Sequence, residues 1–353
     1  MKSLKSWFEK TFPNDPLPRA ERRAVPGLEA LHWTGKAPGL DDIKDISSTG
    51  MYVLTRERWP EGEVNPIRLV CEDLPEDAPA NQVTVETKSV RWGNDGMGLE
   101  FVLPPCMELW LWKTDGLVEA DDILTEFRTA RALAFLRRIC PSATNELNLL
   151  FREGLSNIRI ESAVQIALLA ESMLAREAGS DKFSAPQSLV MRIVQNGSWA
   201  DIDLTQRMWA GMLVTSCTRS GTDESNHAFV DLLSELADIH GRLFASACTK
   251  ATKVLTEPGT VTALPITYTA EELVQIACAK DLQKIDRNLL QMALLGLFEE
   301  RVKVKFFSYD MDANITPTSL GLELYARCQG YRGPAHDYYR SLPDASPAAS
   351  NGR

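Results

Sequence analysis

The chain has 353 residues, with 38 Lys and Arg against 48 Asp and Glu, which gives a formal net charge of −10. This length exceeds the usual size of one compact core and predicts two or three domains. The acidic balance disfavours a chain-wide nucleic-acid coat, which needs clustered cations. No stretch approaches the roughly 18 uncharged apolar residues of a spanning helix, and the N-terminus lacks the continuous apolar segment of a secretory signal.

The N-terminal arm differs in charge from the region after it. Residues 1–18 are predicted to form a short arm that packs on its own protein rather than on a membrane. The first 23 residues hold six basic and three acidic residues, whereas residues 24–104 hold seven basic and fourteen acidic residues. The basic arm is therefore expected to rest against an acidic domain by charge attraction. A cluster of arginines in an acidic chain suggests a compact anion as the partner.

Short apolar runs separated by Gly, Pro and Asp predict a small antiparallel β-barrel over residues 19–104. The predicted strands are Glu29–Trp33, Ile43–Ile46, Gly50–Leu54, Asn65–Cys71, Val83–Trp92 and Met97–Val102. The predicted turns are Thr34–Asp42, Trp59–Gly62, Asp73–Asn81 and Gly93–Gly96. Residues 105–118 are then predicted to be a linker.

A mainly helical domain is predicted over residues 119–260, because apolar residues recur there at helical spacing. Asp203 and Gln206 form a capping-box-like pair that is expected to begin a helix. A long apolar stripe predicts one continuous helix over residues 226–250. Thr269 and Glu272 form a second capping box. The other predicted helices are Asp121–Ile139, Leu147–Leu155 and Ile160–Arg176.

Residues 269–330 have the order of a winged helix. Two helices, Leu273–Ala279 and Ile285–Phe298, precede an alternating run at Val302, Val304 and Phe306, and a last helix begins at Thr316–Pro317. Seven basic and nine acidic residues in this segment disfavour a DNA-reading wing and favour a packing role. The tail, residues 331–353, is predicted to be disordered. The predicted fold class is α+β, a small barrel followed by a helical domain that ends in a winged-helix-like segment.

Two motifs carry the functional hypothesis. Arg19 and Arg23 form R-x-x-x-R, and Asp45–Gly50 forms D-x-S-x-x-G at a strand-to-turn position. Their order and separation, followed by the GMGLEF of Gly96–Phe101, resemble the PilZ domain over roughly residues 17–103. PilZ domains are small bacterial β-barrels that bind the messenger cyclic di-GMP, so the resemblance implies a cyclic di-GMP receptor.

The resemblance also implies residue roles. Arg19 and Arg23 would clamp phosphates and guanines, Asp45 and Ser47 would bond guanine edges, and Gly50 would allow close approach of the ligand. An arginine can both fork to phosphate and stack on a base, and a carboxylate accepts from guanine N–H groups. Arg22 lies in the same arm, and a frame that starts there would put Pro26 at the second arginine position. The alternative is a solvated basic linker beside an ordinary Asp turn.

The helical half resembles the abortive-infection alpha proteins of phage defence. The stretches that carry this resemblance are Asp203–Leu213, Phe229–Phe244 and Ile315–Gly321. The leading hypothesis is a cytoplasmic cyclic di-GMP sensor that signals through its helical half to an unidentified protein partner. The alternative is a phage-defence or interaction module whose barrel is only a scaffold. A DNA-binding regulator is disfavoured by charge.

No enzymatic activity, metal or cofactor beyond the cyclic di-GMP ligand is expected. The seven cysteines are scattered singly, with no C-x-x-C spacing, and predict reduced, mostly buried thiols in a cytoplasmic protein. Cys217 and Cys248 lie on apolar helical faces. The four histidines show no metal-ligand spacing, and no phosphate-binding loop or nucleophile elbow is present.

Overall fold

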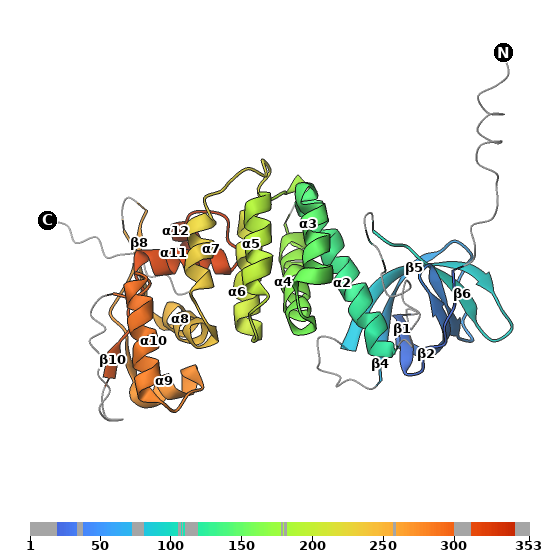
Figure 1. The fold of residues 1–353 in the computed structure, drawn as a ribbon, viewed down its shortest axis with the longest axis horizontal. Coiled ribbons are helices and arrows are strands. Elements are labelled where there is room, and N and C mark those ends of the chain that lie inside the picture. The colour runs from blue at the N-terminus through green and yellow to red at the C-terminus, as the bar shows by residue number, and fades with distance from the viewer. Residues whose placement is uncertain are drawn as a thin grey trace, which may run out of the picture. The chain divides into compact units, whose positions relative to one another are not determined.

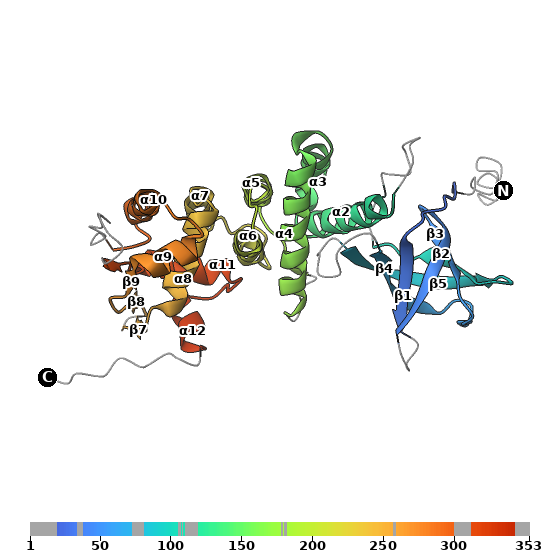
Figure 2. The same cartoon turned by 90° about the horizontal axis from the view of Figure 1, so that it is seen from below.

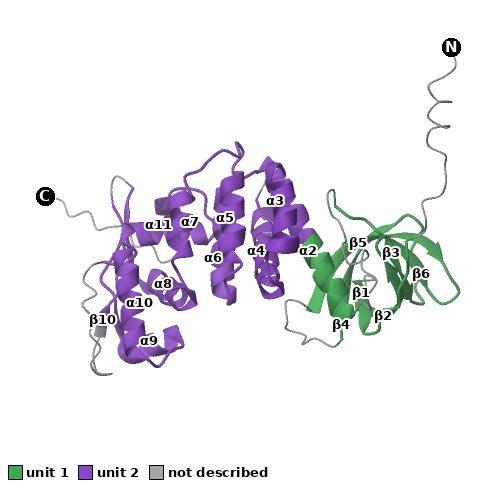
Figure 3. Cartoon of the chain, viewed as in Figure 1, with its two compact units in different colours: residues 1–130 green, residues 131–353 purple. Residues whose placement is uncertain are grey.

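The computed structural model describes residues 20–33, 38–72, 81–104, 107, 109, 119–177, 179, 182–256, 259–299 and 312–342. The chain divides into two compact units, residues 1–130 and residues 131–353 (Figure 3). The first holds a closed antiparallel barrel and the second is mainly helical, which confirms the predicted fold class. None of the helices in the described ranges has both the length and the apolar character needed to cross a membrane.

The barrel has six antiparallel strands in the order β1-β2-β3-β6-β5-β4, and β4 pairs back with β1 (Figure 1). Inward and outward side chains alternate clearly on β5, where Val83 and Val85 are buried and their neighbours are exposed. The strands are β1 (Leu28–Trp33), β2 (Pro38–Ser47), β3 (Gly50–Leu54), β4 (Val64–Cys71), β5 (Gln82–Trp92) and β6 (Met97–Phe101).

One predicted turn is wrong. Residues 38–42 were expected to belong to the turn Thr34–Asp42, but they form the start of β2 and pair with β1. Pro38, Leu40 and Asp42 are exposed in this strand, so its sequence lacks the buried alternation that marks a strand. Backbone pairing with β1, and not side-chain burial, makes this segment extended.

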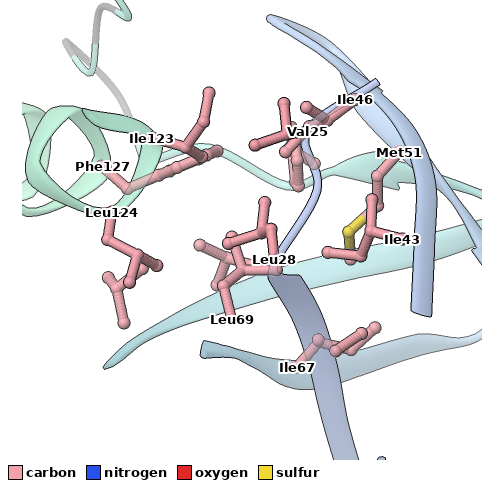
Figure 4. Close-up of a cluster of buried hydrophobic side chains, with 14 of the residues drawn as sticks. Val25, Leu28, Ile43, Ile46, Met51, Ile67, Leu69, Ile123, Leu124 and Phe127 are labelled. Carbon is pink, nitrogen blue, oxygen red and sulfur yellow. The ribbon is translucent and has the colours of Figure 1, made fainter. Parts of the chain in front are cut away.

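The hydrophobic core of the first unit fills the barrel and includes side chains from one end of a helix. Ile46, Met51 and Leu69 are fully buried inside the barrel (Figure 4). Helix α2 (Ala120–Ile139) adds Ile123 and Leu124 to the same cluster (Figure 4). Burying a large apolar side chain contributes about 1.5–3 kcal/mol to the free energy of unfolding. The first half of α2 therefore helps to stabilise the barrel. The barrel unit therefore extends to residue 130, beyond the predicted boundary at residue 104.

The second unit is built from helices around α6, which is buried along most of its length. Helices α4, α5 and α6 lie side by side (Figure 1 and Figure 2). After α2 come α3 (Thr144–Leu149), α4 (Asn157–Ala175), α5 (Gln187–Gly197) and α6 (Asp203–Ser216). A short 3₁₀ helix, η3 (Pro141–Ala143), precedes α3, and a short π-helix, η4 (Leu150–Gly154), follows it. After α6 come α7 (His227–Ser234), α8 (Asp238–Lys250), α9 (Ala270–Ala277), α10 (Leu282–Leu294), α11 (Ser319–Cys328) and α12 (Ala335–Arg340).

Short strands complete this unit. β7 (Lys253–Leu255) pairs with β8 (Val261–Ala263), and β9 (Thr267–Thr269) pairs with β10 (Asp312–Asn314). The latter pair encloses α9 and α10 in the sequence, and α11 follows it. Helix, helix, strand and helix thus occur in the predicted winged-helix order. The alternating run at Val302, Val304 and Phe306 lies outside the described residues.

Three helical predictions are wrong in detail. The expected continuous helix over residues 226–250 is broken into α7 and α8. Asp203 does not cap α6, because Ile202 is the N-cap residue and Asp203 pairs with Arg207 inside the first turn. The predicted disordered tail contains α12, which is held by Tyr339. The side chain of Tyr339 is buried, and its hydroxyl donates to the carbonyl oxygen of Leu322 at 3.0 Å.

Candidate functional site

A β-bulge in β2 determines how the D-x-S-x-x-G motif faces solvent. The pairing with β3 shifts between Ile43 and Asp45, so Lys44 is the extra residue. The shift lets Ile43 and Ile46 both point inward, whereas strict alternation would expose one of them. Asp45 is consequently half-buried on the outside of the barrel, with its carboxylate accessible.

The arginine arm lies directly on this motif. The backbone of Arg23 pairs with Ile46 in both directions, at 2.9 Å and 2.8 Å. The guanidinium of Arg22 forms an ion pair with the Asp45 carboxylate. Arg23 directs its own guanidinium to Glu21 at 3.6 Å. Arg22, Arg23 and Asp45 are therefore brought together, whereas Arg19 lies outside the described residues.

Ser47 and Gly50 are used by the barrel itself. The Ser47 hydroxyl is buried and donates to the carbonyl oxygen of Gly50 at 3.0 Å, which closes the turn between β2 and β3. A Cβ on Gly50 would lie 2.1 Å from the carbonyl oxygen of Leu99 on β6. The close approach that requires a glycine here is made by a neighbouring strand. Asp45 is thus the motif residue whose side chain faces solvent.

A polar triad lies beside Asp45. The Asp95 carboxylate accepts from the Lys44 ammonium at 2.9 Å and from the Tyr52 hydroxyl at 2.8 Å. The bond from Lys44 is the main cause that lowers the pKa of Asp95 and, reciprocally, raises the pKa of Lys44. The ion pair keeps Lys44 directed toward Asp95 on the surface. Sequence reasoning did not find this triad, because its members come from three separate segments.

A cavity of about 550 Å³ opens near the triad, and acidic groups dominate it. It is lined by Asp41, Glu57 and Asp95, with Arg56 and the buried His32 as the basic members. The Nε2–H of His32 donates to Asp41 at 2.6 Å, since a carboxylate oxygen can only accept. This acidic lining repels phosphate, and neither the arginine motif nor the D-x-S-x-x-G motif contributes a residue to it. An anionic ligand would have to bind on the open Arg22–Asp45 surface instead.

An exposed serine–histidine pair occurs in the helical unit. Ser188 Oγ lies 3.2 Å from His227 Nε2, and the Arg192 guanidinium lies 3.1 Å from His227 Nδ1. A guanidinium only donates, so Nδ1 accepts and the ring proton is on Nε2. Nε2 therefore donates to the serine and is unable to take its proton. The pair lacks the polarity that a nucleophilic serine needs.

Buried thiols and histidines in the helical unit are part of its packing. Cys217 and Cys248 are fully buried, as expected from their apolar helical faces. Burial raises the pKa of Cys217 to about 12, so this thiol stays protonated. Among the described residues, no three His, Cys, Asp or Glu side chains are arranged to hold a metal ion.

Comparisons with known proteins address the two units differently. Among solved structures, an uncharacterised Legionella protein covers 24% of this chain and 77% of its own length, at 16% identity and a TM-score of 0.18. No curated protein sequence matches the chain. The barrel has no match to the PilZ family. Residues 161–328, slightly less than half of the chain and wholly within the helical unit, match the family Abortive infection alpha.

Proposed function

We propose that this chain is a phage-defence protein of the abortive-infection type whose helical unit carries the activity. The observation that supports it is the family match over residues 161–328, which falls inside one compact unit. The match covers the tightly packed α6 and α11, where a Cβ on Gly211 would lie 1.9 Å from the carbonyl oxygen of Cys328. In this proposal the barrel is a scaffold or a regulatory module.

Phage challenge of a bacterial host that expresses the full chain tests the proposal. Expression should lower the efficiency of plating, and infected cells should release fewer progeny. Gly211→Val should abolish protection, because the added side chain meets backbone and separates α6 from α11. The control is Arg207→Ala on the same helix, since Arg207 is exposed and pairs only with Asp203 within the described residues. Equal plating with and without the chain, over a broad panel of phages, would refute the proposal.

The barrel surface is tested by the double variant Arg22→Ala/Asp45→Ala. Removing both partners leaves no unpaired charge on the surface. If the barrel is only a scaffold, this variant should protect as well as the natural sequence. Loss of protection with normal expression and folding would mean that the surface regulates the helical unit.

A second candidate is cyclic di-GMP recognition by the barrel. The observation that favours it is the adjacency of the two motifs, since Arg23 pairs through its backbone with Ile46 and Arg22 reaches Asp45. Calorimetric titration of the full chain with cyclic di-GMP, beside cyclic di-AMP and GTP, tests it. Losing a charge-assisted contact in Arg19→Ala or Arg23→Ala should weaken binding roughly tenfold to a hundredfold. Unaltered affinity in both variants would refute the clamp.

A further inference from the structure

A groove of about 490 Å³ lies in the helical unit between α6, α8 and α11. One face of α8 supplies most of its lining, because residues 242, 246, 249 and 250 follow helical spacing. Leu204 of α6 and Tyr325 of α11 complete it. The groove lies within the stretch that matches Abortive infection alpha, and Leu204 and Arg242 belong to two of the segments that carry the resemblance to that family.

Arg242 is the cation of this groove whose guanidinium has no protein partner among the described residues. Its side chain is half-buried, and its guanidinium forms no hydrogen bond or ion pair with any residue that the structure describes. Two nearby cations differ in this respect, since Lys250 pairs with Glu272 at 3.0 Å and Arg207 pairs with Asp203 at 2.8 Å. A guanidinium that has lost part of its water without gaining a partner favours an incoming anion.

Two hydroxyl pairs add hydrogen-bond donors. Thr249 Oγ1 lies 3.1 Å from the Tyr325 hydroxyl, and Ser246 Oγ lies 3.1 Å from the Tyr268 hydroxyl. Each pair has two protons and uses one of them for the bond between its members, so one O–H remains to donate elsewhere. Burial raises the pKa of Tyr325, which keeps this hydroxyl protonated. Among the described residues that line the groove, none is acidic.

We propose that this groove binds a small organic phosphate of about nucleotide size. Arg242 would fork to two phosphate oxygens, and the hydroxyl pair of Thr249 and Tyr325 would donate to a third. Leu204 and Ala245 would contact the apolar part of the ligand. Their side chains form an apolar wall of the groove, which a phosphate group by itself would leave uncovered. The groove is open to solvent, so the ligand would lie along it with one side exposed. This site does not depend on the chain acting in phage defence.

Calorimetric titration of the full chain with AMP, adenosine and inorganic phosphate tests the proposal. AMP should bind saturably, and adenosine and phosphate should each bind much more weakly, since each fills only part of the groove. Arg242→Gln should weaken AMP binding roughly tenfold to a hundredfold. Arg242→Lys should give an intermediate loss, because it keeps the charge without the fork.

The matched control is Arg207→Gln, which removes the same charge from the neighbouring α6. It should leave AMP binding unchanged, and thermal unfolding checks that both glutamine variants are folded. If Arg242→Gln is unfolded, Thr249→Val takes its place, because Thr249 is exposed and the variant removes only the hydroxyl pair. The proposal is overturned by no saturable AMP binding at millimolar concentration or by equal losses in Arg242→Gln and Arg207→Gln. Inorganic phosphate that binds as tightly as AMP would also overturn it.

Discussion

At the residue scale, the D-x-S-x-x-G motif serves the barrel more than its resemblance implies. Ser47 closes a turn through its hydroxyl, and Gly50 makes room for the Leu99 backbone. The turn and the close strand packing would require a serine and a glycine at these positions even in a barrel that binds no ligand. The motif could be read from the sequence, but the strand against which Gly50 packs is about fifty residues away and could not.

Gly50→Ala should destabilise the barrel by about 1–3 kcal/mol, the usual cost of overpacking a filled interior. A Cβ at this position meets a backbone atom, so no side-chain rotation relieves the contact. Amide hydrogen exchange in β3 and β6 of the full chain measures the loss locally. Ser48→Ala in the same turn is the control and should leave exchange unchanged. Normal protection of β3 and β6 in Gly50→Ala would contradict the packing role.

At the element scale, predictions succeeded where the local sequence contains the cause of the structure. The capping box at Thr269 and Glu272 is confirmed, with reciprocal bonds of 3.1 Å and 2.8 Å. The break between α7 and α8 was missed, because residues 235–237 hold no Gly or Pro and the apolar stripe continues through them. His240 instead accepts from the Ala237 backbone N–H at 2.9 Å and starts α8. That bond is local, but Ala237 and His240 are not the Ser/Thr and Glu/Gln by which a capping box is predicted from sequence.

Thr269→Ala should destabilise α9 by about 0.5–2 kcal/mol, because it removes the N-cap acceptor. Glu272→Ala should also loosen the first turn, since this carboxylate accepts from the Thr269 N–H and pairs with Lys250. The control is Glu271→Ala, which removes the same charge from the same turn. Hydrogen exchange in α9 should rise in the first two variants and stay unchanged in the third. Equal exchange in Glu271→Ala and Glu272→Ala would mean that only helix-dipole charge matters.

The stability of the helical unit should fall as pH decreases below 6.5, the ordinary pKa of His240. Burial lowers the pKa of His240, so the unfolded chain takes up the proton before the folded one does. The neutral ring's contribution is present above the ordinary value and is lost as pH falls through the lowered pKa. Protonation also removes the Nδ1 lone pair that accepts from Ala237.

Thermal unfolding from about pH 7.5 to about pH 5.5, the range in which histidine titrates, measures this effect. His240→Gln keeps a side-chain acceptor without a titrating group, so its unfolding temperature should depend less on pH. Ser234→Ala is the control, because Ser234 is exposed on α7 and the change removes no titrating group, so the pH dependence of the parent should persist. A His240→Gln profile parallel to that of the parent would contradict the assignment.

At the scale of the whole molecule, α2 is the element that both units share. Ile123, Leu124 and Phe127 belong to the barrel core, and the helix continues past residue 130 into the second unit. Acidic residues in its first turn and arginines in its last predicted one continuous helix here. That the barrel would recruit its first half was not predictable, because an apolar face does not specify its partner.

Cyclic di-GMP binding to the barrel, if it occurs, should therefore change hydrogen exchange along α2. Phe127 packs its ring on Phe101 of β6, with centroids 4.9 Å apart, so a shift of the barrel wall reaches the helix directly. The motif segments, residues 17–23 and 45–50, should gain protection through the ligand itself. A ligand shifts an equilibrium only by its differential affinity for two states, so the change in α2 should disappear in Arg19→Ala/Arg23→Ala. Protection limited to the two motif segments would mean that the barrel binds the ligand without passing a signal, and the barrel would then act independently of the helical unit.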